Sequence, residues 1–244
     1  WFAPEGYALS EADLDKPDVL LNDNHPVVAD EPIREKWSFR RSNYFEHVGN
    51  ECRHVHEKVG IQDMSAFAKC EISGPGAEAW LDQLLTNAVP KKVGRVTLSY
   101  LLTHKGGVRS EFTVYKAAPQ RYYLVSAGAY ERHDHDYLKK ALPRDGSVSF
   151  ERLTTAMGVL VLAGPRSRDV LAKLTDTDLS NDAFPWLTGK KMSIGLAQVD
   201  ALRVNFIGEL GWEIHHPIEM QNYIFDRLME AGAELEIKPF GIRA

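Results

Sequence analysis

The sequence predicts an α+β fold built from two related halves. A Gly-Pro pair precedes an amphipathic helical pattern twice, at Gly74-Pro75 and at Gly164-Pro165, with an offset of 90 residues. An apolar strand pattern comes before each pair, and two further strand patterns and a second helical pattern follow it. Two copies indicate a duplicated unit rather than a solenoid. We therefore expect the halves to pack face to face, with a site between them.

The elements of the first half follow from local patterns. Residues 43–60 read NYFEHVGNECRHVHEKVG, which predicts a helix ended by Gly60. AKCEISG predicts a strand, and Pro75 then suits the first turn of a helix, where its missing N–H is not needed. TLSYLLTHKGGVRSEFTVYK predicts two strands around Gly106-Gly107, and YERHDHDYLKKAL predicts the closing helix.

The second half repeats this plan. GVLVLAGPRSRDVLAKLT predicts a strand and a helix, and AQVDALRVNFIGELGWEIHH predicts two strands around a bend at 208–211. IEMQNYIFDRLMEAG predicts the closing helix. We place the half-repeats at about 60–150 and 151–240, inside one domain of residues 37–244.

Residues 1–36 differ from the rest of the chain. They are rich in Pro, Asp and Glu and show no clear period, which predicts an extended linker. The chain begins with Trp1 rather than Met, and no signal peptide is recognisable. We therefore expect the sequence to be part of a longer protein.

The composition indicates a soluble globular protein. The 244 residues are 44% hydrophobic and 26% charged, with a net charge of -5. This balance does not favour nucleic acid or a membrane as a partner, and no apolar run approaches the roughly 20 residues that span a bilayer. Cys52 and Cys70 form no CxxC motif, so a reducing compartment is the simpler interpretation, with Cys70 a buried structural thiol.

Glu209 occupies an unusual place in the second half. Residues 202–216 alternate apolar and polar side chains on both sides of Gly208-Glu209-Leu210-Gly211, which predicts a β-hairpin. Asn or Asp is the usual companion of Gly in such a turn. The carboxylate of Glu209 could accept two N–H bonds from an amino-pyrimidine edge, or it could be an ordinary exposed turn residue.

Glu111 follows the glycines of the first hairpin. It could be a buried acid that positions or protonates a reacting amine, or a polar residue on the wet face of an antiparallel strand. Because each predicted hairpin carries an acid near its glycines, we predict that Glu111 and Glu209 converge on one cleft. Arg203, in the strand before the second bend, could pair with an acid or be an ordinary charged strand residue.

The sequence does not predict a metal site. His54 and His56 lie two positions apart on one helix and therefore point in different directions. The HDHD segment at 133–136 is typical of a solvated helix end, and HExxH is absent. The sequence ISGPGAEAW contains part of a dinucleotide-binding motif, but it lacks the third glycine and the following acid.

Several of these segments, in this order, resemble one known family. They are SFRRSNYFEHVGNECRHVHEKVGIQDMSAFAKCEISGPGAEAWLDQL, YLLTHKGGVRSEFTV, GVLVLAGPRSRDVLAKLT, DLSNDAFPW and ALRVNFIGELGWEI. They resemble the folate-binding region of dimethylglycine and sarcosine dehydrogenases, which is similar to the glycine-cleavage T-protein. The resemblance runs from about residue 37 to the end. It implies two related α+β subdomains, and we expect the family's C-terminal β-barrel to be absent from this chain.

The resemblance also implies a reaction. In this family an FAD domain, expected before residue 1, oxidises an N-methyl amine to an iminium. Tetrahydrofolate captures the iminium carbon in the folate-binding region and becomes 5,10-methylenetetrahydrofolate. The expected partners are thus a small N-methyl amine and folate. The expected location is the cytoplasm of a bacterium or the mitochondrial matrix of a eukaryote.

Several site residues follow from the resemblance. Glu111 takes the place of a family Asp that assists methylene transfer, so it is the predicted catalytic residue. Glu209 takes the place of the glutamate that binds the amino-pyrimidine edge of the pterin, and Ala127 stands where T-proteins often have Asn. The predicted cofactor-binding residues are Tyr100, Ala127, Arg203, Gly208, Glu209 and Gly211.

Two alternatives to this function stay open. The chain could belong to a flavin-free, folate-dependent demethylase or aminomethyltransferase. It could also be a non-catalytic module that uses the same fold as a scaffold, because fold alone does not determine function. Glu in place of Asp at position 111 supports this second alternative. Folate binding would discriminate a folate-dependent enzyme from a scaffold module.

Overall fold

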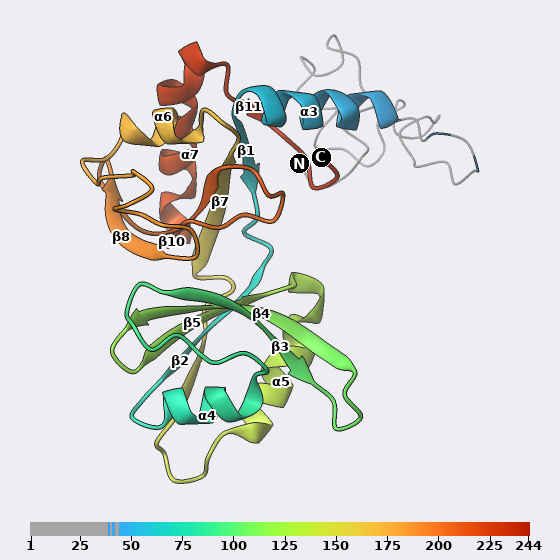
Figure 1. Cartoon of the computed structure of the whole chain (residues 1–244), viewed down its shortest axis with the longest axis vertical. Coiled ribbons are helices and arrows are strands. Elements are labelled where there is room, and N and C mark those ends of the chain that lie inside the picture. Colours follow the sequence, from blue (N-terminus) through green and yellow to red (C-terminus); the bar gives the residue numbers. More distant parts are fainter. Residues whose placement is uncertain (1–38, 40, 42–43) are drawn as a thin grey trace.

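The structure is a computed structural model that describes residues 39, 41 and 44–244. The predicted linker at 1–36 lies outside the described residues. The chain forms two sheets with helices, and each sheet belongs to one layer of the molecule (Figure 1). The predicted α+β class with two related subdomains is confirmed.

The first sheet has five strands in the order β3-β4-β5-β2-β6. Each neighbouring pair in it is antiparallel. Helices α4 and α5 pack against it through one apolar cluster that includes Trp80, Leu81 and Leu138. The bounds are β2 Ala68–Ser73, α4 Ala77–Leu84, β3 Val96–Leu102, β4 Val108–Ala118, β5 Arg121–Ser126, α5 Glu131–Ala141 and β6 Ser149–Arg152.

The second sheet has six strands in the order β11-β1-β7-β10-β9-β8. Helices α6 and α7 pack on it around Trp212, Phe184 and Leu228, all fully buried. Helix α3 precedes β1, and η2, η3 and η4 are short 3-10 turns. The bounds are α3 Phe45–Glu57, β1 Gly60–Asp63, η2 Gly128–Tyr130, β7 Met157–Ala163, α6 Ser167–Ala172, β8 Gly189–Ile194, β9 Ala197–Leu202, β10 Gly211–Pro217, η3 Ile218–Met220, α7 Gln221–Gly232, η4 Ala233–Leu235 and β11 Lys238–Pro239.

The two sheets repeat one topology and exchange a strand. The order β3-β4-β5-β2-β6 in the first sheet matches β8-β9-β10-β7-β1 in the second. Strand β1 comes first along the chain but pairs with β7, whereas β6 pairs back with β2. The chain therefore crosses between the layers at both of these strands (Figure 1). This exchange ties the two sheets together.

The repeat corrects one expectation about the hairpins. The β3–β4 hairpin that carries Glu111 corresponds to β8–β9, not to the β9–β10 connection that carries Glu209. Strand β8 was not predicted, because its segment GKKMSI carries two lysines and lacks clear alternation. In addition, residues 203–210 form a connection rather than strand. The turn between the two strands is therefore longer than the predicted bend at 208–211.

Two glycines hold matching turns in the two halves. Gly74 and Gly164 both have a φ of +117°, a conformation that L side chains rarely adopt. A Cβ on Gly164 would lie 2.6 Å from the backbone oxygens of Val55 and Lys58, and one on Gly74 would overlap with the carbonyl of Ser147. The repeated Gly-Pro pair thus marks the point where each strand turns closely past a neighbouring segment into its helix.

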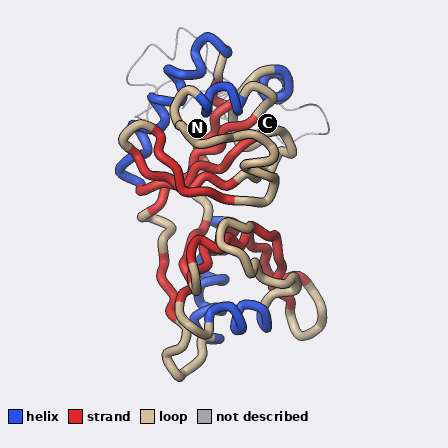
Figure 2. The backbone as a smooth tube through the Cα atoms, turned by 60° about the vertical axis from the view of Figure 1, so that its left-hand side comes forward, coloured by secondary structure: helices blue, strands red, loops and turns tan. Residues whose placement is uncertain are grey.

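The helices of each half lie on the side of its sheet that faces away from the other half (Figure 2). A third apolar cluster joins the two sheets, and Tyr115, Val96 and Leu202 are its most buried members. Helix α3 ends at Glu57, before Gly60, because Gly60 already pairs with β7 and β11. The predicted helix therefore exists but ends earlier than expected.

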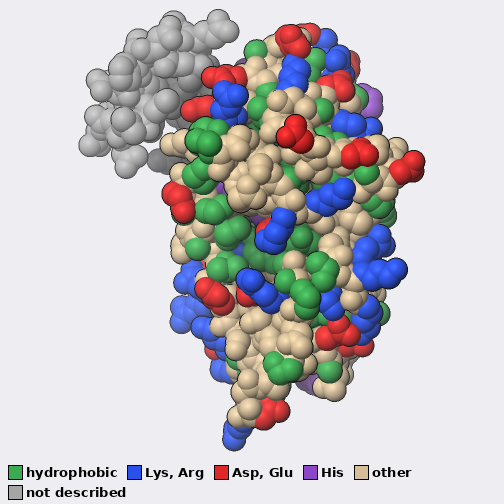
Figure 3. Space-filling view, turned by 90° about the vertical axis from the view of Figure 1, so that its left-hand side faces the viewer, with side chains coloured by type: hydrophobic (Ala, Val, Ile, Leu, Met, Phe, Trp, Pro, Cys, Tyr) green, Lys and Arg blue, Asp and Glu red, His purple; other side chains and the backbone are tan. Residues whose placement is uncertain are grey.

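The surface carries both signs of charge. Figure 3 shows acidic and basic side chains interspersed on one face, with hydrophobic side chains reaching the surface at mid-height. Cys70 is buried as predicted, and burial raises the pKa of its thiol, while Cys52 is exposed. None of the helices in the described part of the chain is long and apolar enough to cross a membrane.

Candidate functional site

A cavity of about 600 Å³ lies where both halves and helix α3 meet. Ala127 lines it from the first half, and residues of β7, β10 and the 203–210 connection line it from the second. Its polar lining includes two acids, Glu209 and Glu213. Its walls are otherwise mainly apolar and include Val55, Met64, Phe67, Val161 and Ile207.

Glu213 is the buried acid of this cavity. Only 6% of the residue is exposed, and its Oε2 lies 3.2 Å from Nε2 of His215. Because β10 alternates its side chains, Trp212 and Ile214 enter the core under the helices, while Glu213 and His215 face the other way. Glu213 was not among the predicted site residues, although the alternation in GWEIHH was a signal that could have identified it.

A hydrogen-bonded chain connects Glu213 to the first half. Nδ1 of His215 lies 3.1 Å from the hydroxyl of Tyr123 on β5. Burial raises the pKa of Tyr123, so its hydroxyl keeps its proton and can donate. A carboxylate only accepts, so Nε2 of His215 carries the proton toward Glu213. Glu213 is therefore held in a fixed orientation by residues from both sheets.

Glu209 is the more exposed acid of the cavity. Its Oε1 lies 2.8 Å from Nδ1 of His56 on α3, and its side chain is 30% exposed. The bond to Glu209 raises the pKa of His56. The amide of Asn205 holds the connection in place, because it donates to the carbonyl of Glu209 and accepts from the N–H of Gly208. The connection thus presents Glu209 beside the cavity.

The predicted residues Glu111 and Tyr100 lie together elsewhere. They are cross-strand partners in the β3–β4 hairpin, and both side chains are exposed. The charge of Glu111 and a hydrogen bond to it raise the pKa of Tyr100. Neither residue is among those that line the cavity. The structure therefore does not bring Glu111 and Glu209 to the same cavity, and the reason is the shift by one hairpin in the repeat.

Arg203 is directed to another part of the second half. It follows the last residue of β9, and its guanidinium donates to the carbonyl of Phe184 at 2.5 Å and to Oδ1 of Asn181 at 2.8 Å. Gly208 lies in the connection with a φ of +81°. Gly211 opens β10 close to the carbonyl of Leu162. Of the six predicted cofactor-binding residues, Ala127 and Glu209 line the cavity.

The histidines of the predicted helix ends have separate partners. Nε2 of His54 lies 2.7 Å from the carbonyl of Glu236, whereas His56 contacts Glu209. Nδ1 of His133 contacts the next residue, Asp134. Within residues 39, 41 and 44–244, no group of three or more His, Cys, Asp or Glu side chains is placed to hold a metal ion.

The chain is similar to parts of larger enzymes. It is 41% identical over 208 residues to dimethylglycine dehydrogenase, mitochondrial, of Mus musculus. The aligned region covers 85% of this chain and 24% of that protein. It is 29% identical over 227 residues to sarcosine dehydrogenase, mitochondrial, of Homo sapiens. The aligned region covers 87% of this chain and 25% of that protein. The chain thus spans about a quarter of the length of these curated relatives.

A solved structure and a family assignment agree with this similarity. The glycine cleavage system aminomethyltransferase T from Bartonella henselae superposes with a TM-score of 0.69 at 25% identity, covering 81% of this chain and 52% of that one. Residues 24–244 match the family described as the GCVT N-terminal domain. The match includes the cavity, both acids and both halves of the repeat. The chain therefore belongs to the GCVT N-terminal domain family.

Proposed function

We propose that this chain binds tetrahydrofolate in the cavity between its halves. In this proposal the chain is the folate-binding, methylene-transfer portion of an FAD-dependent, N-demethylating dehydrogenase of the dimethylglycine or sarcosine type. The observation that carries the proposal is a cavity of about 600 Å³ with apolar walls and a buried, oriented acid, Glu213. Such a volume, lined mainly by apolar groups with few polar ones, is typical of small-molecule sites.

The lining fits the chemistry of a pterin ring. The amino-pyrimidine edge offers two N–H donors, and a carboxylate with two oxygens can accept both. Glu213 is the stronger candidate for this contact because water competes less for a buried acceptor. Glu209 is more exposed and already contacts His56, so we assign it a secondary contact. The apolar walls, among them Phe67 and Met64, would cover the ring faces.

The residues of this chain bind and orient, while folate supplies the nitrogen atoms that accept the one-carbon unit. Glu111, the predicted catalytic acid, lies outside the cavity lining beside Tyr100. The family resemblance nevertheless assigns Glu111 to methylene transfer, so in the complete dehydrogenase Glu111→Gln should leave folate affinity unchanged and release more of the one-carbon unit as formaldehyde. An unchanged product ratio would remove Glu111 from the mechanism.

The amine, the flavin and the compartment belong to the complete protein. The named relatives suggest dimethylglycine or sarcosine as the N-methyl amine, and FAD would lie in a domain outside this chain. Because the mouse and human relatives are mitochondrial, we infer a mitochondrial matrix location if the source is a eukaryote. The amine and folate are both small-molecule partners.

Calorimetric titration with tetrahydrofolate tests the folate proposal directly. We expect the wild-type chain to bind, and Glu213→Gln to weaken binding by more than about tenfold, since an anionic acceptor is lost from a buried place. Glu209→Gln is the matched control and should cost less, because its carboxylate is more exposed. A larger loss for Glu209→Gln would exchange the two roles. No binding by the wild type would favour the scaffold alternative.

A further inference from the structure

Two clusters at equivalent places in the halves differ in charge. The first-half cluster consists of Glu78, Lys91, Lys116 and Tyr122. The second-half cluster consists of Arg168, Asn181, Arg203 and Trp212. Each contains a residue of the first helical turn, a residue of the loop after that helix, and two residues from or next to neighbouring strands. The repeat offset relates 78 to 168 and 122 to 212. Tyr115 and Leu202 pair with residues 123 and 213, which the same offset relates, so the next residues, 116 and 203, also correspond.

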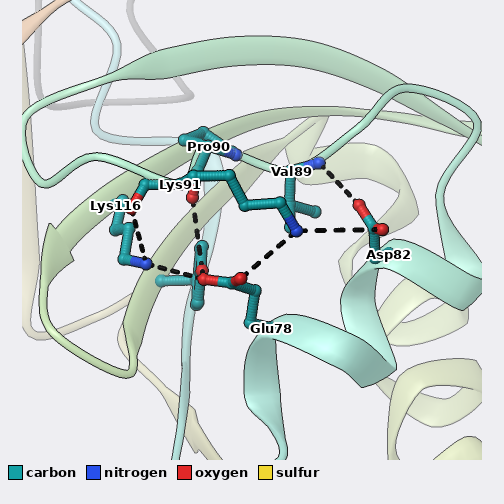
Figure 4. Close-up of polar contacts among 7 residues, drawn as sticks. Glu78, Asp82, Val89, Pro90, Lys91 and Lys116 are labelled. Atoms are coloured by element: carbon teal, nitrogen blue, oxygen red, sulfur yellow. Dashed lines mark hydrogen bonds and ion pairs between the residues drawn. The ribbon is translucent and has the colours of Figure 1, made fainter.

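A carboxylate is the centre of the first-half cluster. Oε2 of Glu78 accepts hydrogen bonds of 2.7 Å from both Lys116 and Tyr122, and its Oε1 lies 3.2 Å from Nζ of Lys91 (Figure 4). The bond from Lys116, followed by those from Tyr122 and Lys91, lowers the pKa of Glu78 to about 2. Two cations and one hydroxyl donor thus share one anion, the carboxylate of Glu78.

The second-half cluster has two cations and no anion. The guanidinium groups of Arg168 and Arg203 both donate to the same atom, Oδ1 of Asn181, at 2.7 and 2.8 Å. Their central carbons each lie 5.9 Å from the ring of Trp212. Among the described residues, no carboxylate forms an ion pair with either arginine; the adjacent Asp169 pairs with Arg166 instead.

Donors in this cluster also lack acceptors. Nε of Arg168 and Nε1 of Trp212 are buried without a hydrogen-bond partner. In the first half, the equivalent of Trp212 is Tyr122, whose hydroxyl donates to Glu78. Burial is the main cause of the lowered pKa of Arg203, and the like charge of Arg168 adds to it. The place that Glu78 fills in one half therefore lacks a negative group in the other.

We propose that the second-half cluster binds a small oxyanion, a phosphate or a carboxylate, between Arg168 and Arg203. Guanidinium groups match the oxygens of both anions with paired N–H bonds. Both arginines are half-buried and Asn181 is exposed, so an anion can reach them from solvent. The site is separate from the cavity, because none of the four residues of the cluster lines it. It does not depend on folate binding.

The test uses a substitution that copies the other half. Inorganic phosphate and, separately, acetate are titrated into the chain by calorimetry at constant ionic strength, with sodium chloride as the balancing salt. Arg168→Glu places an acid beside Arg203 as Glu78 lies beside Lys116, and it should lower the affinity by at least about tenfold. Binding of either anion that is lost in Arg168→Glu supports the proposal. No binding, or equal binding by the variant, overturns it.

A second pair of variants guards against misfolding. Arg203→Gln removes one cation and keeps a polar side chain, and it should also weaken anion binding by at least about tenfold. Lys116→Gln makes the same change in the first half and should leave the affinity for the anion unaltered. If Lys116→Gln weakens anion binding as much as Arg203→Gln does, the effect is general surface charge and the assigned site is wrong.

Discussion

The connections β4–β5 and β9–β10 occupy equivalent places in the two sheets but differ in length and content. Strands β4 and β5 are joined directly through residues 119–120, whereas β9 and β10 are joined through residues 203–210. The longer connection carries Phe206, Ile207 and Glu209 to the cavity, and the short one contributes none of its residues to the lining. The repeat thus supplies the frame, and the site arises where one copy departs from it.

A second departure lies one strand further on. Residues 123 and 213 hold equivalent positions in β5 and β10. Residue 123 pairs with Tyr115 of β4, and residue 213 pairs with Leu202 of β9. The first is Tyr123 and the second is Glu213, and His215 connects them across the sheets. Neither sheet alone provides this arrangement. The halves are therefore complementary because they carry different polar residues at matched positions.

The largest effect should come from the shared frame. Gly74→Ala and Gly164→Ala should each lower the free energy of unfolding by at least about 3 kcal/mol, because a side chain there combines backbone strain with overlap. Gly106→Ala is the control, since Gly106 has a positive φ but nothing within 4 Å of its Cβ position. Urea unfolding of the three variants measures the difference. Equal losses at all three positions would contradict the proposed close approach.

A smaller and pH-dependent effect should separate the halves at Lys69. This lysine is fully buried, and burial lowers its pKa to about 8 from 10.5, while the repeat offset relates it to the buried Val159. Between those pH values the unfolded chain binds more protons than the folded one, so stability rises with pH, by up to about 3 kcal/mol. Lys69→Val copies the second half and should abolish this rise in urea unfolding. A rise of the same size in the variant would assign it to other groups.

The smallest effect should come from the chain that orients Glu213. Tyr123→Phe removes the hydroxyl that contacts His215 and should cost about 1 kcal/mol of stability, the worth of one hydrogen bond. Folate affinity should fall only a few-fold, since Glu213 itself remains. Tyr115→Phe, which removes a hydroxyl bonded to Asp200, is the matched control and should not change affinity. A loss of affinity in Tyr115→Phe alone would contradict this role of Tyr123.

Local patterns predicted the parts of this fold that local interactions determine. The Gly-Pro pairs at 74 and 164 predicted both first helices, because a turn with a positive φ and a helix start depend on neighbouring residues. The strand exchange of β1 and β6 was not predicted, because it depends on pairing between residues far apart in the chain. Strand β8 was not predicted because its two lysines obscure the strand pattern. Without β8, the β3–β4 hairpin was matched to the β9–β10 connection instead of to β8–β9.

The candidate site was predicted in part for a similar reason. Glu209 stands out in the sequence because glycines surround it, and it does line the cavity. Glu213 stands inside an apolar strand segment, where its role depends on which face of β10 meets the cavity. Period-two alternation could place Glu213 and His215 on one face, but only the packing of the first half shows that this face is functional.

Protection of Cys52 by folate tests the central claim most directly. Cys52 lines the cavity and is exposed, whereas Cys70 is buried, so a maleimide should modify Cys52 selectively. If tetrahydrofolate binds in this cavity, it should slow the modification of Cys52, and Glu213→Gln should lose that protection at the same folate concentration. An unchanged rate in the wild-type chain at saturating tetrahydrofolate would contradict the cavity as the folate site.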